Sequence, residues 1–107
     1  MRAGKLRHRI SIERAIETQD SSYNEAVLQW VLFAEVSANI IPLSGRELIR
    51  AKQVELETDT EITIRYMDGL SPKMRIVYRD RVFEILNIIN TEERNREIRL
   101  LCSEVKP

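Results

Sequence analysis

The chain has 107 residues, of which 43% are hydrophobic, which is enough for one modest core but not for two. Lys plus Arg and Asp plus Glu number 17 each, so the molecule as a whole lacks the positive field that drives non-specific binding to nucleic acid. No segment approaches the roughly 20 apolar residues of a membrane span, so we expect a single soluble domain over residues 1–107 with no membrane partner.

Apolar and polar residues alternate from Leu6 onward, which predicts a half-buried strand. Its inward face would carry Leu6, His8, Ile10 and Ile12. The next segment, residues 17–25, is polar and rich in turn-forming residues, so it predicts a hairpin loop.

A longer apolar segment runs from Val27 to Ile41 and predicts a second strand. We expect a bulge or bend near residues 33–35, between the half that contains Trp30 and the half in which Val36, Ala38 and Ile40 alternate. We interpret Trp30 as a core anchor, with a stacking platform for a base or ligand as the alternative.

A short helix is predicted after this strand, over about residues 45–54. Ser44 and Glu47 have the spacing of a capping box, and Leu43 and Leu48 stand where a hydrophobic staple would close around it.

The rest of the chain predicts further short strands, separated by turns at Asp68-Gly69 and at residues 79–81. Taken together, about six strands, one short helix and mainly hairpin connections indicate a mainly β fold, either a small antiparallel barrel or a sandwich, with closure favoured because it removes exposed edges. The predicted core is Leu6, Ile10, Ile12, Trp30, Ile62, Ile64, Tyr66, Ile76, Tyr78, Phe83, Ile85, Ile98 and Leu100.

Residue types that carry catalysis or bind metals are scarce. The chain has one histidine and one cysteine, His8 and Cys102, and both stand on inward faces of predicted strands. Its three glycines are too far apart for a phosphate-binding loop, and its carboxylates are best interpreted as solvated strand faces. We therefore expect no catalytic residue, no metal and no cofactor. Cys102 cannot form a disulfide within the chain, which fits a reducing cytoplasm.

The neutral total conceals two segments of opposite charge. The basic residues are Arg2, Lys5, Arg7 and Arg9, and the acidic ones are Glu55, Glu57, Asp59 and Glu61. Each segment can be a solvated face. Alternatively, the basic and acidic edges of adjacent copies meet in a head-to-tail interface that closes into a ring.

Several short motifs resemble, in order and spacing, those of phage head-tail joining proteins, also called head-closure, head completion or stopper proteins of siphophages. The motifs are Gly4-Lys5-Leu6-Arg7-His8-Arg9-Ile10, Trp30, Pro42-Leu43-Ser44-Gly45-Arg46-Glu47, Ile64-Arg65-Tyr66, Met74-Arg75-Ile76, Phe83-Glu84-Ile85, Glu93-Arg94-Asn95-Arg96-Glu97 and Leu100-Leu101-Cys102. Two turns differ from relatives, because Asn24 stands where glycine is frequent and the hairpin at Arg79-Asp80-Arg81 has no glycine.

The resemblance implies a non-enzymatic structural protein with a small barrel and a helix. It would assemble in the host bacterial cytoplasm into a ring, commonly of twelve copies, at the head-tail connector of the virion. Its partners would be the portal or adaptor proteins, the tail proteins and other copies of itself. DNA would pass through the ring without sequence-specific binding. The channel-facing segment would be about residues 44–60, and the acids in it and directly after it, Glu55, Glu57, Asp59 and Glu61, would repel phosphates.

Two other functions remain open. The protein could be a related adaptor or tail-completion ring protein. It could also be a barrel that binds single-stranded nucleic acid through the basic N-terminal segment and Trp30.

Overall fold

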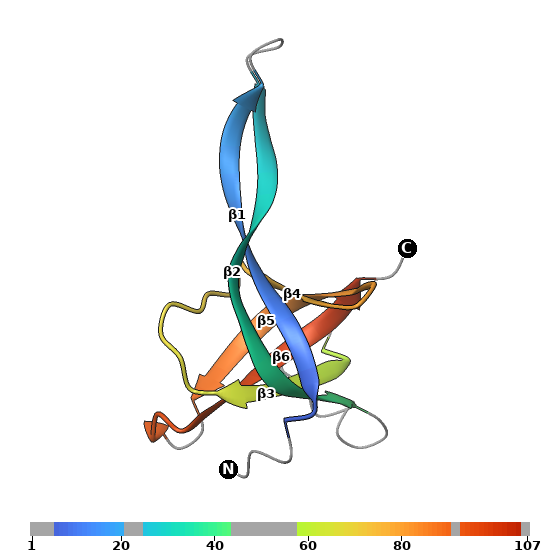
Figure 1. Ribbon diagram of the computed structural model, residues 1–107, viewed down its shortest axis with the longest axis vertical. Helices are drawn as coiled ribbons and strands as arrows, with labels where there is room; N and C mark the ends of the chain where they lie inside the picture. Colours follow the sequence, from blue (N-terminus) through green and yellow to red (C-terminus); the bar gives the residue numbers. More distant parts are fainter. Residues whose placement is uncertain (1–5, 21–24, 44–57, 91–92, 106–107) are drawn as a thin grey trace.

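Six strands form a closed antiparallel barrel in the order β1-β2-β3-β6-β5-β4 (Figure 1). The computed structural model describes residues 6–20, 25–43, 58–90 and 93–105. The strands are β1 (His8–Asp20), β2 (Glu25–Pro42), β3 (Thr60–Arg65), β4 (Arg75–Tyr78), β5 (Arg81–Asn90) and β6 (Glu97–Val105). The predicted mainly β class is confirmed, and the fold is the barrel and not the sandwich. The predicted helix over residues 45–54 and its cap, Ser44 and Glu47, lie outside the described residues.

The core fills the barrel interior, and the inward residues of all six strands meet there. Alternation along each strand puts every second side chain inside, as in the buried positions 60, 62 and 64 of β3. The buried apolar residues are Ile10, Ile12, Ala38, Ile62, Ile64, Met74, Ile76, Phe83, Ile85, Ile98, Leu100 and Cys102. Tyr66 and Tyr78 are partly buried and pack against this cluster. The predicted inward faces of the strands are thus confirmed, although Leu6 is only half-buried.

The predicted bulge is confirmed at Phe33. Ile12 pairs with Ala34 and the next residue, Glu13, pairs with Leu32, so Phe33 has no opposite partner. Its ring packs against the core. A one-residue bulge reverses the phase of everything before it, because side chains alternate with period two.

This reversal makes the prediction of Trp30 as a core residue wrong. Without the bulge, Trp30 would share the face of Val36 and Ala38, but with it Trp30 turns to the outer surface. There the guanidinium carbon of Arg75 lies 4.3 Å from the centre of the indole ring, within cation–π range. Arg75 Nε also donates to Glu13 Oε1 at 2.7 Å, which fixes the guanidinium over the ring.

Beyond the bulge, β1 and β2 continue as a two-stranded ribbon that projects from the barrel (Figure 1). We call residues 13–20 and 25–32 the arm. The prediction of a loop over residues 17–25 is wrong for most of its length, because pairing continues to Asp20 and Glu25. Polar residues are tolerated in this exposed ribbon, and Thr18 Oγ1 donates to the Val27 carbonyl at 3.3 Å.

Candidate interaction surfaces

The basic N-terminal residues that the structure describes are at the surface. Arg7 and Arg9 are both exposed at the beginning of β1, and Arg9 Nη1 donates to Ser37 Oγ on β2 at 3.5 Å. Arg2 and Lys5 lie outside the described residues. Arg7 and Arg9 thus place positive charge at the surface of the barrel.

The acidic segment divides into two halves. Glu55 and Glu57 lie outside the described residues, whereas the carboxylates of Asp59 and Glu61 are bound to other residues of the barrel. Glu61 forms an ion pair with Arg99 of β6. Asp59 Oδ1 accepts hydrogen bonds from the Glu104 backbone N–H at 3.0 Å and from the Thr60 hydroxyl at 2.9 Å. Glu61 thus links β3 to β6. Asp59, just before β3, is bound both to β6 and to the first residue of β3.

His8 and Cys102 contribute to packing within the barrel. His8 Nδ1 accepts a hydrogen bond from the Ile40 backbone N–H at 3.3 Å, and its ring meets Tyr78 edge to face at 5.2 Å. Cys102 is fully buried, and this burial, with the nearby Asp59 carboxylate, raises the pKa of its thiol to about 12. A thiol held protonated is a poor nucleophile. Within the described ranges, no group of three or more His, Cys, Asp or Glu residues could hold a metal ion.

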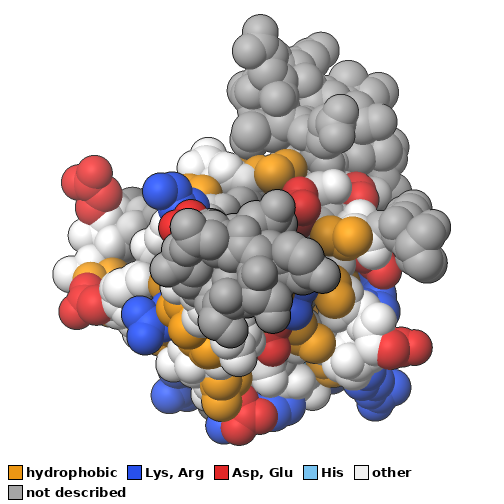
Figure 2. All heavy atoms as spheres, turned by 90° about the horizontal axis from the view of Figure 1, so that it is seen from above, with side chains coloured by type: hydrophobic (Ala, Val, Ile, Leu, Met, Phe, Trp, Pro, Cys, Tyr) orange, Lys and Arg blue, Asp and Glu red, His pale blue; other side chains and the backbone are white. Residues whose placement is uncertain are grey.

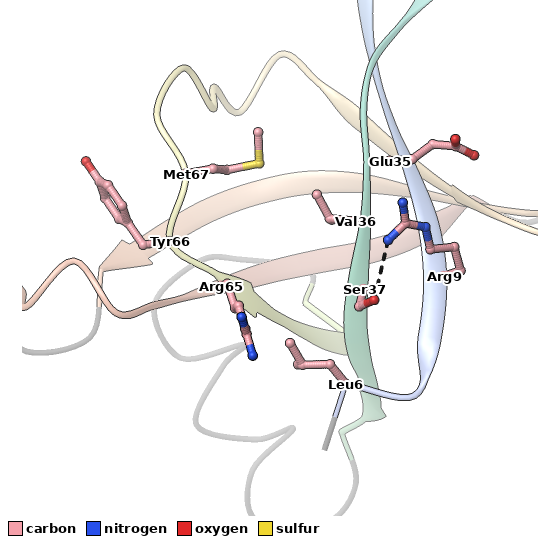
Figure 3. A pocket seen from close by; sticks show the side chains of 8 residues that line it. All are labelled: Leu6, Arg9, Glu35, Val36, Ser37, Arg65, Tyr66 and Met67. Carbon is pink, nitrogen blue, oxygen red and sulfur yellow. Dashed lines mark hydrogen bonds between the residues drawn. The ribbon is translucent and has the colours of Figure 1, made fainter. Parts of the chain in front are cut away.

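One pocket opens beside Arg9, where β1, β2 and the end of β3 approach one another (Figure 3). It has a volume of about 450 Å³ and combines apolar walls with arginines from two strands. The lining residues are Leu6, Arg9, Glu35, Val36, Ser37, Arg65, Tyr66 and Met67. The pocket is open and carries more positive than negative charge, so it suits an acidic surface of a partner better than a small-molecule substrate.

A second hollow, of about 500 Å³, lies on the outer surface of the barrel at the base of the arm. Trp30 forms its wall on the arm side, and β5 and the end of β6 contribute Val82, Leu86 and Val105. Lys73 lines it and is exposed. We call this cavity the outer hollow.

The arm is a feature that was not predicted from the sequence. Leu28 and Leu32 are 61% and 59% exposed, and hydrophobic side chains show at the surface in a view down the arm (Figure 2). The signal in the sequence is that Val27 and Leu28, and again Val31 and Leu32, are adjacent apolar pairs, because neighbours on one strand cannot both face a core.

The profile of the phage head completion protein family matches residues 1–105, almost the whole chain. The chain belongs to this family. The family is one of structural proteins and not of enzymes, as the sequence predicted. No curated protein matches the sequence. No helix in the described part of this head completion protein is long and apolar enough to cross a membrane.

Two solved structures share the fold. The solution structure of a protein from Shigella flexneri 2a has a TM-score of 0.78 and 25% sequence identity, over 97% of this chain and 96% of that one. A chain from the virion of a native gene transfer agent particle has a TM-score of 0.63 and 18% identity, over 94% and 96% of the two chains. The barrel therefore recurs in proteins of very different sequence.

Proposed function

We propose that this head completion protein forms a ring at the head-tail connector, closes the DNA-filled head and presents the surface to which the tail attaches. The observation that carries the proposal is the family match over residues 1–105. The same fold in a chain of a gene transfer agent virion supports a place in the particle. The particle would be a long-tailed phage, assembled in the cytoplasm of the bacterial host.

The surfaces fit a protein that acts by contacts. We assign Arg7, Arg9 and the pocket with Arg65 to binding an acidic surface, either of the portal-adaptor complex or of an adjacent copy. Arg2 and Lys5 would extend this basic surface. The tail proteins would bind a different face of the ring.

The acidic segment would face the DNA. Because Asp59 and Glu61 are engaged by β3 and β6, we assign repulsion of DNA phosphates mainly to Glu55 and Glu57, within the proposed channel-facing segment 44–60. Fixed negative charge along a channel lets DNA slide, since no cation holds its backbone. The proposed ring would thus pass DNA without reading its sequence.

The alternative functions are less well supported. Portal adaptors are typically helical, whereas the described chain consists mostly of strands. A barrel that binds single strands would need an open aromatic platform, but Arg75 lies over one face of Trp30. A tail-completion ring at the other end of the same junction remains the second candidate, because its surfaces would be similar.

Deletion of the gene in its phage tests the proposal, with the wild-type gene supplied in trans as the control. We expect packaged heads that lose their DNA and free tails that do not attach, and wild-type protein should restore tailed particles. The double variant Glu55→Lys, Glu57→Lys should remain folded but fail to restore the yield, whereas Glu55→Asp, Glu57→Asp should restore it. Infectious tailed particles at normal yield without the gene would contradict the proposal. Intact tailless heads that retain their DNA, with incomplete free tails, would favour the tail-completion alternative.

A further inference from the structure

The exposed large hydrophobic residues of the described chain gather in one region. They are Ile16, Val27, Leu28 and Leu32 of the arm, and Val105, which lines the outer hollow at its base. A two-stranded ribbon is at best marginally stable in water, and a large apolar patch on it marks a contact surface. The packing of the barrel therefore does not account for the exposed hydrophobic residues of the arm.

The pairing register shows which side chains share a face of the arm. Glu17 lies opposite Leu28, Ala15 opposite Trp30 and Glu13 opposite Leu32. Directly opposed residues of an antiparallel pair point to the same side. One side, which we call the arm face, therefore carries Leu28 and Leu32 on β2 and the carboxylate of Glu17 on β1.

The lining of the outer hollow complements the arm face in polarity and charge. Its apolar lining includes Val82, Leu86 and Val105. Its charged lining residues are Lys73, Arg75 and Glu84, of which Arg75 is paired with Glu13. Among the described residues, neither Lys73 nor Glu17 forms an ion pair, so each charge is available to a partner of opposite sign. Leucines beside an acid on the arm face thus match an apolar cavity beside a base.

We propose that the arm face of one copy docks in the outer hollow of the next copy. Leu28 would pack on Val82 and Val105, and Glu17 would pair with Lys73. The inference rests on the proposed ring and names one of its contacts. Because arm and hollow are different surfaces of the same chain, the contact is heterologous and repeats from copy to copy until the ring closes.

The dimensions permit this contact. Strand residues 13–20 extend over about 26 Å at the rise of about 3.3 Å per residue of a β-strand. The two shorter extents of the molecule are 29 and 27 Å. The arm is therefore about as long as one copy is wide, so its face can lie across a neighbour.

Cross-linking within assembled particles tests the contact. The double variant Leu28→Cys, Val105→Cys is supplied to a phage that lacks the gene, and its particles are oxidised and separated without reductant. We expect a ladder of disulfide-linked multimers of this chain, at least tenfold more abundant than from Leu28→Cys, Thr63→Cys, whose second cysteine lies on β3 outside the hollow. The native Cys102 is buried and should not react.

Charge exchange tests the same contact independently. Glu17→Lys and Lys73→Glu should each reduce the yield of tailed particles at least tenfold, while the purified variants melt like the wild type. The double variant Glu17→Lys, Lys73→Glu should restore the yield, because the pair is re-formed between copies. A purely structural role of either residue would give no such rescue.

The outcomes separate this contact from the function on which it rests. Particles that contain the cysteine variant but show no ladder, or in which Leu28→Cys links to a different protein, overturn the arm-to-hollow contact and leave head closure standing. Single charge variants without effect, or a double variant without rescue, also overturn it. Particles in which the protein is absent from the head-tail junction would overturn the proposed function itself.

Discussion

Two threonines near the beginning of β3 differ sharply in how their buried hydroxyls are satisfied. Thr58 is 0% exposed, and its Oγ1 has no hydrogen-bond partner among the described residues. Thr60 is 4% exposed, and its hydroxyl donates to Asp59 at 2.9 Å. A buried unpaired hydroxyl costs free energy, whereas a paired one stabilises the fold.

Substitution of each threonine by valine should therefore have opposite effects. Thr58→Val exchanges the unpaired hydroxyl for a methyl group of similar size and should raise the free energy of unfolding by about 1 kcal/mol. Thr60→Val loses the bond to Asp59 and should lower it by about 1 kcal/mol. Urea unfolding measures both, and a loss of stability in Thr58→Val equal to that in Thr60→Val would contradict this interpretation.

The thiol of Cys102 makes stability depend on alkaline pH. Burial raises its pKa from the ordinary value of 9.0 to about 12, so above pH 9 the unfolded chain loses a proton that the folded chain keeps. The stabilisation is complete below pH 9 and is lost as the pH rises toward 12. Between pH 8 and pH 10 the unfolding free energy of the wild type should fall by about 1 kcal/mol more than that of Cys102→Ala. Parallel pH profiles for the two proteins would be the contrary result.

At the scale of elements, the bulge in β2 and the turn after β3 depend on each other. Gly69 has φ of 91°, a conformation that favours glycine, and a Cβ placed there would lie 3.0 Å from Phe33 Cζ. Phe33 is the bulged residue, and its ring occupies the space that the missing side chain leaves. The turn therefore holds the bulge in position.

Gly69→Ala should lower the free energy of unfolding by about 1–3 kcal/mol, through backbone strain and the contact with Phe33. Adding Phe33→Leu should recover the steric part only, so the two changes should be non-additive. A double-mutant cycle by chemical denaturation measures this coupling. Additive effects would show that the ring and the turn are independent.

The strands and their inward faces could be predicted because alternation depends only on local sequence, as in Ile62 and Ile64 of β3. The bulge could also be placed, but not its consequence for Trp30, whose position depends on a one-residue offset between paired strands. The turn at residues 79–80 shows the same limit. The sequence shows only that this hairpin has no glycine, and the structure shows that Arg79 is the residue with φ of 56°.

The candidate site was less predictable than the fold. Charge clusters are visible in the sequence, but whether a carboxylate is free depends on residues far along the chain, such as Arg99 for Glu61. The arm was hidden because polar residues at 17–20 are typical of loops, and only the distant register of β1 with β2 shows that they are extended. Which distant residues pair depends on the tertiary structure and cannot be obtained from the local sequence pattern.

At the scale of the whole molecule, the structure consists of a closed barrel and the arm that projects from it. The pairing of residues 11–13 of β1 with residues 75–77 of β4 removes the free edges that an open sheet would present. The arm extends beyond this closure and presents apolar side chains at the surface. A closed body with one exposed ribbon suits assembly into a defined ring, since contacts are limited to chosen surfaces.

A cryo-electron microscopy reconstruction of the head-tail junction tests the central claim most directly. In particles of the phage that carries this gene, we predict a ring of copies of this barrel between the portal complex and the tail. Each β1-β2 arm should lie against a neighbouring copy, and residues 44–60 should be on the inner side of the ring. A junction fully accounted for by other proteins, with this chain absent from it, would contradict the account.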